Sequence, residues 1–284
     1  MKGYLLNGRF VAGAEFTIDP SEPFFAHGYG LFETVRVAAK KPLFLNPHMA
    51  RMVSTASNLG MDCPFDAAKL RAWIDELIKK TGVDNARLKF MLLAKNDGSS
   101  DVLITVEQVD PLPSKFPAIA VGRAAPEFQG RSMAGFKTMN YMVNRLAEAE
   151  GRKRGLDEVY FALDEGWISE GTRSTLFFVK DDVLHTPSLD LPILPGVTRL
   201  VVLHLAKRAG FAVREGHYVS GDFQSADEAF LLGSFSLFRP IQTFDGQPLA
   251  VAPGPVTQSL ILGYLELAAG KAELPEGSER ALLG

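Results

Sequence analysis

The first third of the chain alternates between strand-like and helix-like patterns. Residues 2–12 switch between apolar and polar positions and are interrupted at Asn7-Gly8, a pair that favours a tight hairpin turn. Apolar positions recur with helical spacing in residues 48–60 and 67–82, and each of these segments ends at a glycine. The pattern predicts a compact α+β domain. Its strands are expected at 2–12, 31–37, 41–45, 87–95 and 101–109.

The remaining chain predicts a second domain behind a short linker. Residues 125–135, APEFQGRSMAG, are polar, contain glycine and show no periodicity, so they are expected to connect two folded parts. Beyond them the pattern predicts helices at 138–150, 198–210 and 255–270, and strands at 158–164, 175–180 and 228–234. The expected organisation is an N-terminal α+β domain at 1–120, an interdomain strand and linker at 121–135, and a C-terminal α/β domain at 136–284.

Composition narrows the class of protein. With 284 residues, of which 46% are hydrophobic and 22% charged, the chain can bury two modest cores. A net charge of -3 argues against nucleic acid or an anionic membrane surface as the main partner. The N-terminal residues lack the apolar core of a signal peptide, and no apolar run is long enough to span a bilayer. A cytoplasmic protein is the expectation.

The cysteine and histidine content excludes further chemistry. Cys63 is the only cysteine, so no disulfide can form within the chain, which is compatible with a reducing compartment. The five histidines show neither HxH nor HxxxH spacing, so we expect no metal site.

Two glycine-containing segments have the form of anion sites. Pro195-Gly196 interrupts the chain just before a predicted helix, so the amides of Val197 and Thr198 would lie in its first turn, where a phosphate monoester can bind. Ordinary helix capping explains the same residues. Gly233-Ser234 ends a predicted strand with residues small enough for an anion to approach the backbone, although taken alone the segment is better explained as a plain turn at a strand end.

Several charged residues are candidates for chemistry. Lys137 precedes a predicted helix, whose dipole would favour the neutral, nucleophilic amine that Schiff-base chemistry needs. Glu170 lies near the end of an apolar strand, where a carboxylate can pair with a protonated ring nitrogen. Arg51 and His48 lie one helical turn apart and could face one anion. Each has an ordinary alternative: an exposed lysine, a turn acid or a solvated helix surface.

The order of these segments is more specific than any one of them. Along the chain they are HGYGLFETVRV, HMARM, KTMNYMVNRLAEAEG, LDEVYFALDEGWISEGTRSTLFFV, TPSLDLPILPGVTR and LLGSFSLFRPI. Read together, these segments resemble the class IV aminotransferases from about residue 2 to residue 248. That family has fold type IV, as in D-amino-acid aminotransferase, and includes branched-chain and D-amino-acid transaminases and aminodeoxychorismate lyases.

The resemblance implies a two-domain homodimer that binds pyridoxal 5'-phosphate. Lys137 matches the lysine that forms the Schiff base and moves the substrate's α-proton, and Glu170 matches the acid at the pyridine nitrogen. The cofactor-binding residues implied by the family pattern are Arg51, Lys137, Tyr141, Glu170, Val197, Thr198 and Ser234, with Tyr141 matching a tyrosine that touches the ring's phenolic oxygen in some members.

The expected activity is transfer of an amino group between an amino acid and a 2-keto acid. Phe32, Arg36 and Lys95 are candidates for the substrate pocket. Phe32 stands where D-specific members have tyrosine, which favours the L-branched-chain or lyase groups, and a branched-chain-like substrate is the expectation. A lyase that releases pyruvate is the alternative, and a catalytically silent binder of a phosphorylated metabolite is a more distant one. Thr175 and Arg173 depart from the family pattern, which usually has asparagine and a small residue there.

Overall fold

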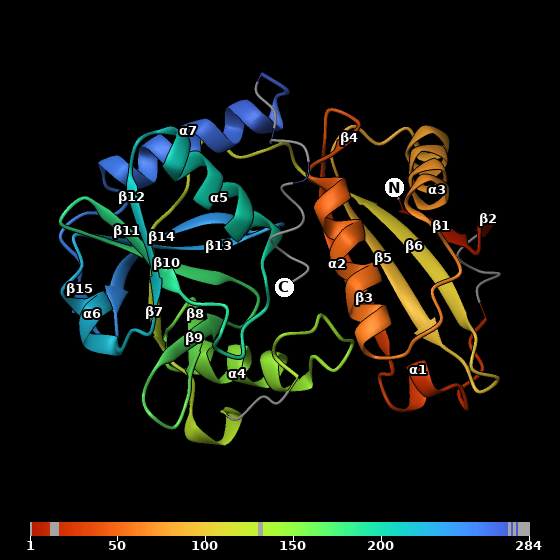
Figure 1. Cartoon of the computed structure of the whole chain (residues 1–284), viewed down its shortest axis with the longest axis horizontal. Helices are drawn as coiled ribbons and strands as arrows, with labels where there is room; N and C mark the ends of the chain where they lie inside the picture. Colours follow the sequence, from red (N-terminus) through yellow and green to blue (C-terminus); the bar gives the residue numbers. More distant parts are fainter. Residues whose placement is uncertain (1, 12–16, 130–132, 272–273, 275–276, 278–284) are drawn as a thin grey trace. The chain divides into compact units, whose positions relative to one another are not determined.

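The computed structural model describes residues 2–11, 17–129 and 133–271, with Leu274 and Gly277. The chain divides into two units, and the first consists mainly of Met1–Pro113 and Phe136–Asn140 (Figure 1). The second contains Ser114–Gly135 and Tyr141–Pro275. This division differs from the expected domains because residues 121–123 pair within the second unit's sheet, and because the segment around Lys137 returns to the first unit.

The first unit is built on a six-stranded antiparallel sheet in the order β2-β1-β6-β5-β3-β4. The predicted hairpin at Asn7-Gly8 is confirmed: both residues have positive φ, 48° and 83°, as a tight turn between twisted strands requires. Its strands are β1 (Lys2–Leu6), β2 (Arg9–Val11), β3 (Gly30–Ala38), β4 (Lys41–Pro42), β5 (Ala86–Ala94) and β6 (Ser100–Gln108).

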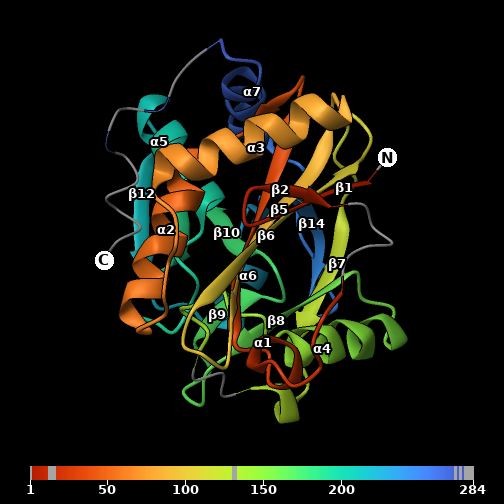
Figure 2. The same ribbon diagram turned by 90° about the vertical axis from the view of Figure 1, so that its right-hand side faces the viewer.

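Two helices, α2 (Leu45–Asn58) and α3 (Ala67–Thr81), cover one face of this sheet (Figure 2). Strand alternation turns every second side chain toward them, and in β5 these are Leu88, Phe90 and Leu92, all fully buried. The short helix α1 (Pro23–Ala26) precedes β3.

Two element boundaries differ from the expected ones near residue 44. The strand expected at 41–45 is reduced to β4, and the helix expected at 48–60 already begins at Leu45. Phe44 adopts a left-handed conformation with φ 53°, which ends the extended strand and turns the chain directly into α2.

The second unit contains a nine-stranded mixed sheet. Its strand order is β12-β11-β10-β13-β14-β7-β8-β9, and β15 pairs with β14. The parallel pairs are β11 with β12, β14 with β7, and β7 with β8. The strands are β7 (Ile119–Arg123), β8 (Glu158–Ala162), β9 (Ile168–Gly171), β10 (Thr175–Lys180), β11 (Val183–Pro187), β12 (Ala212–Gly216), β13 (Glu228–Gly233), β14 (Leu237–Phe244) and β15 (Gln247–Pro248).

Helices α5 (Val197–Arg208) and α7 (Pro255–Ala268) pack against each other and against β13. The core beneath them includes the stacked rings of Phe177 and Phe230, whose centroids lie 5.0 Å apart. The other helical segments are η2 (Pro126–Phe128), α4 (Met142–Lys153) and α6 (Ser220–Gln224). Among the described helices, none is both long and apolar enough to cross a bilayer.

The start of α7 is held by a buried carboxylate rather than by a capping residue of its own. Glu228, at the start of β13, accepts hydrogen bonds from the backbone amides of Val256 at 3.0 Å and Thr257 at 2.8 Å. These amides have no acceptor within the helix, so the carboxylate satisfies them and complements the positive end of the helix dipole. Glu228 thereby ties α7 to the central strands.

We predict that Glu228→Ala lowers the free energy of unfolding by about 2 kcal/mol, because two buried amides lose a charged acceptor. Urea unfolding of the purified protein measures the change. The exposed Glu165→Ala is the control and should shift stability by less than about 0.5 kcal/mol. Equal effects of the two substitutions would contradict this account of α7.

Candidate active site

The segment around Lys137 runs beside the start of β3. The Phe32 amide donates to the Lys137 carbonyl at 3.0 Å, and the Met139 amide donates to the Gly30 carbonyl at 2.8 Å. This pairing holds the half-buried Lys137 with its Nζ 4.6 Å from the centroid of the Phe32 ring. The ring face attracts a cation, so it is a favourable neighbour for the protonated amine.

The expectation that Lys137 stands at a helix start is wrong. The helix expected at 138–150 is α4, which begins only at Met142, because residues 137–139 are engaged in the pairing with β3. The influence of a helix dipole falls off within the first turn. The position of Lys137 therefore comes from backbone pairing within the first unit.

A buried charged cluster joins β3 to α2. Glu33 accepts from Arg51 Nε at 2.8 Å through Oε1 and from Arg51 Nη2 at 2.7 Å through Oε2, and His48 Nδ1 lies 2.7 Å from the same Oε2. Glu33, His48 and Arg51 are only 1%, 1% and 3% exposed. The alternative of a solvated Arg51 is thus wrong. His48 and Arg51 do face one anion, and within the protein that anion is the Glu33 carboxylate.

The protonation states of this cluster follow from its neighbours. Burial alone would raise the pKa of Glu33, but the Arg51 charge and the His48 hydrogen bond outweigh it and lower the pKa from 4.5 to about 2. Burial lowers the pKa of His48, assisted by the positive charges of Arg51 and Lys137, against the opposing effect of Glu33. We therefore treat Glu33 as ionised and His48 as neutral at pH 7.

Glu33 is absent from the candidates predicted from the sequence, although its place in the strand pattern is informative. In residues 31–37 the inward-facing positions are Leu31, Glu33, Val35 and Val37, so a carboxylate stands in an otherwise apolar register. Acidic residues are almost never fully buried unless they are paired. That mismatch could have identified Glu33 as the partner of a buried cation.

In the second unit, Glu170 lies within β9 and is buried. Its Oε2 accepts a hydrogen bond from the Leu194 amide at 3.0 Å, in the segment that leads into α5. The carboxylate is therefore fixed relative to the start of that helix. A buried, anchored carboxylate suits the role of partner for a protonated ring nitrogen.

The start of α5 has the features of an anion cradle. Gly196 occupies the N-cap position with no side chain to accept from the helix amides, and Val197 and Thr198 are buried in the first turn. A Cβ on Gly196 would lie 3.0 Å from the Thr175 hydroxyl, so that hydroxyl is close to the helix start. Uncapped amides together with the Thr198 hydroxyl suit a phosphate monoester.

The connection between β9 and β10 lies against a second backbone turn. A Cβ on Gly233 would lie 2.7 Å from the Ser236 hydroxyl and 3.0 Å from the Arg173 carbonyl, so a larger residue just before the half-buried Ser234 would displace its neighbours. Arg173 itself donates to Glu148 Oε1 at 2.7 Å, so α4 holds its charged end. Among the described residues, the buried Ser174 hydroxyl has no hydrogen-bond partner.

The other sequence-predicted residues lie in different surroundings. Arg36 is buried and donates to the backbone carbonyls of Asp110 and Pro111. Lys95 Nζ lies 3.8 Å from the exposed Asp97. Tyr141 precedes α4 and is half-buried.

The structure groups the predicted residues by unit. The first unit contains Phe32, Arg51 and Lys137, and the second contains Tyr141, Glu170, Val197, Thr198 and Ser234.

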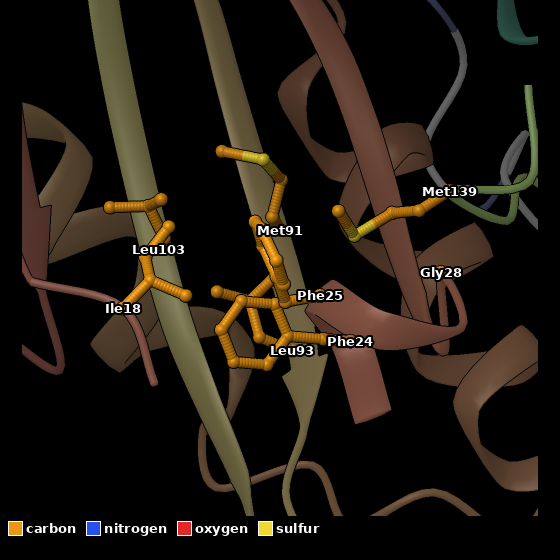
Figure 3. A pocket seen from close by; sticks show the side chains of 8 residues that line it. All are labelled: Ile18, Phe24, Phe25, Gly28, Met91, Leu93, Leu103 and Met139. Atoms are coloured by element: carbon orange, nitrogen blue, oxygen red, sulfur yellow. The ribbon is translucent and has the colours of Figure 1, made fainter. Parts of the chain in front are cut away.

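The first unit also has an apolar cavity of about 340 Å³ on the sheet face opposite α2 and α3 (Figure 3). Its lining has no ionisable side chain, so it is suited to apolar contact rather than to proton transfer. It is lined by Ile18, Phe24, Phe25, Gly28, Met91, Leu93, Leu103 and Met139.

Comparison with known proteins identifies the class. The family described as amino-transferase class IV matches residues 30–244. A putative branched-chain-amino-acid aminotransferase of Methanocaldococcus jannaschii is 29% identical, covering 87% of this chain and 89% of that protein. An aminodeoxychorismate lyase of Bacillus subtilis is 27% identical, covering 91% and 92%. The crystal structure of a branched-chain aminotransferase of Thermoproteus uzoniensis with norvaline superposes with a TM-score of 0.88 at 27% identity, covering 95% and 96%.

The chain therefore belongs to the class IV aminotransferase family, and it is a pyridoxal-phosphate-dependent enzyme. The predicted resemblance, fold class and cofactor are confirmed. The residues present fit that cofactor. The amine of Lys137 beside an aromatic ring suits an aldehyde, and the buried carboxylate of Glu170 suits a protonated ring nitrogen. The uncapped start of α5 and the unpartnered hydroxyl of Ser174 suit a phosphate.

The cluster around Glu33 predicts a specific dependence of stability on pH. Because folding lowers the pKa of Glu33, its ionised form stabilises the native state fully above pH 4.5, and this contribution is lost as the pH falls toward about 2. The contribution amounts to about 3 kcal/mol.

Urea unfolding across this pH range tests the prediction. Wild-type protein should lose about 3 kcal/mol more than Glu33→Gln between pH 4.5 and pH 2. The exposed Glu165→Gln should follow the wild-type curve. Parallel curves for wild type and Glu33→Gln would show that Glu33 does not titrate as described.

Proposed function

We propose that this enzyme is an amino-acid transaminase in which Lys137 is the catalytic lysine. The observation that carries the proposal is the pairing of the Lys137 segment with β3, which holds Nζ 4.6 Å from the Phe32 ring centroid and in the same unit as Arg51. A catalytic amine needs such a fixed position, since misplacement by about 1 Å can reduce the rate a hundredfold.

The remaining site residues divide between binding and charge control. Arg51, the amides of Val197 and Thr198, and the hydroxyls of Thr198 and Ser234 would hold the phosphate. Glu170 would hold a proton on the pyridine nitrogen, with its orientation fixed by the Leu194 amide. Tyr141 would contact the ring's phenolic oxygen.

When bound, pyridoxal phosphate accepts the electron pair that remains after the substrate loses its α-proton. The amine of Lys137 takes that proton as general base and returns it to another carbon as general acid. The Phe32 ring stabilises the protonated amine between the two transfers. Glu170 keeps the ring nitrogen cationic throughout. The net reaction would turn the amino-acid donor into its 2-keto acid and the 2-keto acid acceptor into its amino acid.

Phe32 also bears on the substrate, because an aromatic side chain beside Lys137 favours an apolar amino acid of the branched-chain type. Arg36 and Lys95 stay candidates for the pocket. The similarity to the Bacillus subtilis lyase supports a second candidate, a lyase that releases pyruvate, because it extends over 91% of this chain.

A panel of L- and D-amino acids separates these activities. For a transaminase we expect each good donor to convert the bound cofactor to pyridoxamine phosphate, seen as loss of the visible absorption band, with L-leucine, L-isoleucine or L-valine among the fastest. A lyase would instead release pyruvate from one substrate without lasting conversion. Failure of every donor would contradict the transaminase proposal.

Lys137→Ala serves as the control for the same measurement. Without the amine we expect no visible band of lysine-bound cofactor and a loss of conversion rate of at least about a thousandfold. Unchanged conversion would exclude Lys137 as the catalytic lysine. Absence of the visible band in the wild-type protein as well would instead support a catalytically silent binder of a phosphorylated metabolite.

We also propose a homodimer located in the cytoplasm. The location is supported by a single cysteine and the lack of a bilayer-spanning helix among those described. The dimer is supported by exposed aromatic residues at the apolar cavity of the first unit: Phe25 is 58% exposed, and the nearby Tyr29 is 47% exposed. Exposed apolar surface of this kind typically mediates association.

Light scattering after size exclusion tests this assembly. We expect a mass of about twice 31.0 kDa, and a shift toward 31.0 kDa in Phe25→Asp. Leu262 on α7 is similarly exposed, and Leu262→Asp should leave the mass unchanged. A monomeric wild type would contradict the proposed dimer.

A further inference from the structure

The buried cluster of Glu33, His48 and Arg51 lacks an adequate explanation in stability alone. Ionised Glu33 is more stable in the fold than protonated Glu33, but that comparison keeps the cluster in place. Compared with apolar residues, a buried ion pair recovers little more than the desolvation of its two charges, and well-packed apolar residues commonly do as well. Leu31 and Val35 flank Glu33 on the same face of β3, Met52 follows Arg51 in α2, and all three belong to the buried apolar core of this unit. An apolar substitute would fit this environment, so the charged groups point to a role beyond folding.

The geometry of the cluster fixes one edge of the Arg51 guanidinium. Glu33 engages Nε and Nη2 in a two-point fork, with distances of 2.8 and 2.7 Å. Such a fork determines both the plane and the direction of the group. The N–H groups of Nη1 and the second N–H of Nη2 form the other edge of the guanidinium, outside this fork. Because the group is planar and rigid, Glu33 also sets the direction in which this other edge points.

His48 fixes the carboxylate in turn. Because Glu33 is ionised, it can only accept hydrogen bonds, so Nδ1 of the neutral His48 must carry the proton that it donates to Oε2. His48 and Arg51 are three residues apart on one face of α2, which allows both to reach the same carboxylate. His48 thus orients the Glu33 carboxylate, and that carboxylate in turn orients Arg51.

We propose that Glu33 and His48 are positioning residues for Arg51, which they orient to bind the cofactor's phosphate. The inference rests on the proposed phosphate-binding role of Arg51 and extends it to two residues that do not themselves touch the ligand. Glu33 could also act only by neutralising the charge of Arg51. In that case, removing the charge of Glu33 would strengthen anion binding by Arg51. If Glu33 instead orients Arg51, removing its charge would weaken anion binding.

The test measures equilibrium binding to the full-length protein with two probes. Pyridoxamine phosphate carries the phosphate and forms no bond with Lys137, and pyridoxamine lacks the phosphate. For Glu33→Gln we expect the Kd of pyridoxamine phosphate to rise about tenfold or more, while the Kd of pyridoxamine changes less than about twofold. In an Arg51→Gln background, adding Glu33→Gln should change either Kd by less than about twofold.

A matched pair at His48 provides a second test that does not depend on how well Glu33→Gln folds. In asparagine, as in histidine, a nitrogen that can donate is bonded to Cγ, so His48→Asn should keep the Kd of pyridoxamine phosphate within about twofold of wild type. His48→Leu fills similar space without a donor and should raise that Kd about threefold or more. Thermal unfolding of each variant shows how far stability changes.

The outcomes separate the hypotheses. Tighter or unchanged binding of pyridoxamine phosphate by Glu33→Gln, or equal effects of the two His48 variants, would overturn the inference and leave the proposed function intact. A parallel loss of affinity for both probes would also overturn it, because the effect would then be structural. If wild-type protein fails to bind pyridoxamine phosphate, or if Arg51→Gln binds it normally, the proposed role of Arg51 fails first.

Discussion

The backbone pairing between the Lys137 segment and the start of β3 is the constraint on which the proposed chemistry depends. The stretch Phe136–Asn140 belongs to the first unit, although the residues on either side of it belong to the second. Two hydrogen bonds, from Phe32 to Lys137 and from Met139 to Gly30, hold it there. Backbone bonds of this kind fix the position of the main chain independently of side-chain identity. The proposed catalytic lysine is thereby fixed to the same sheet that carries Phe32 and Glu33.

Charge in the first unit is organised around one strand. The face of β3 that carries Glu33 turns toward α2 and meets Arg51 and His48, while the face that carries Phe32 meets the amine of Lys137. Side chains alternate across a strand, so a single rigid element positions both the proposed phosphate-binding cation and the proposed catalytic amine. A rigid strand is more precise than a loop as a support for such groups.

In the second unit, residues 172–175, where β9 leads into β10, lie against both the N-cap of α5 and the turn that follows β13. Thr175 lies against the N-cap of α5, and the Arg173 carbonyl lies against Gly233 just before Ser234. The departures from the family pattern at these positions are accommodated locally: Glu148 holds the Arg173 side chain, and the Thr175 hydroxyl occupies the space beside Gly196. Neither departure removes the anchored carboxylate of Glu170 or the uncapped start of α5.

Local pattern was sufficient for the elements whose boundaries depend on nearby residues. The hairpin at Asn7-Gly8 and the glycine stop of α3 at Gly82 were both predictable, because a positive φ is a local property of such residues. The order of motifs likewise led to the family and its cofactor. The start of α4 was not predictable in this way, because residues that suit a helix instead pair with a distant strand.

The sequence by itself thus determined the strands of the first unit, the longer helices of both units, the family to which the chain belongs and the candidates for its site. Only the tertiary structure decided the partners of the charged groups, because the residues that neutralise and orient a buried charge are far apart along the chain. Arg51 illustrates the difference: its helical pattern alone allows a solvated arginine. The burial of Glu33 on a neighbouring strand makes it an oriented cation instead.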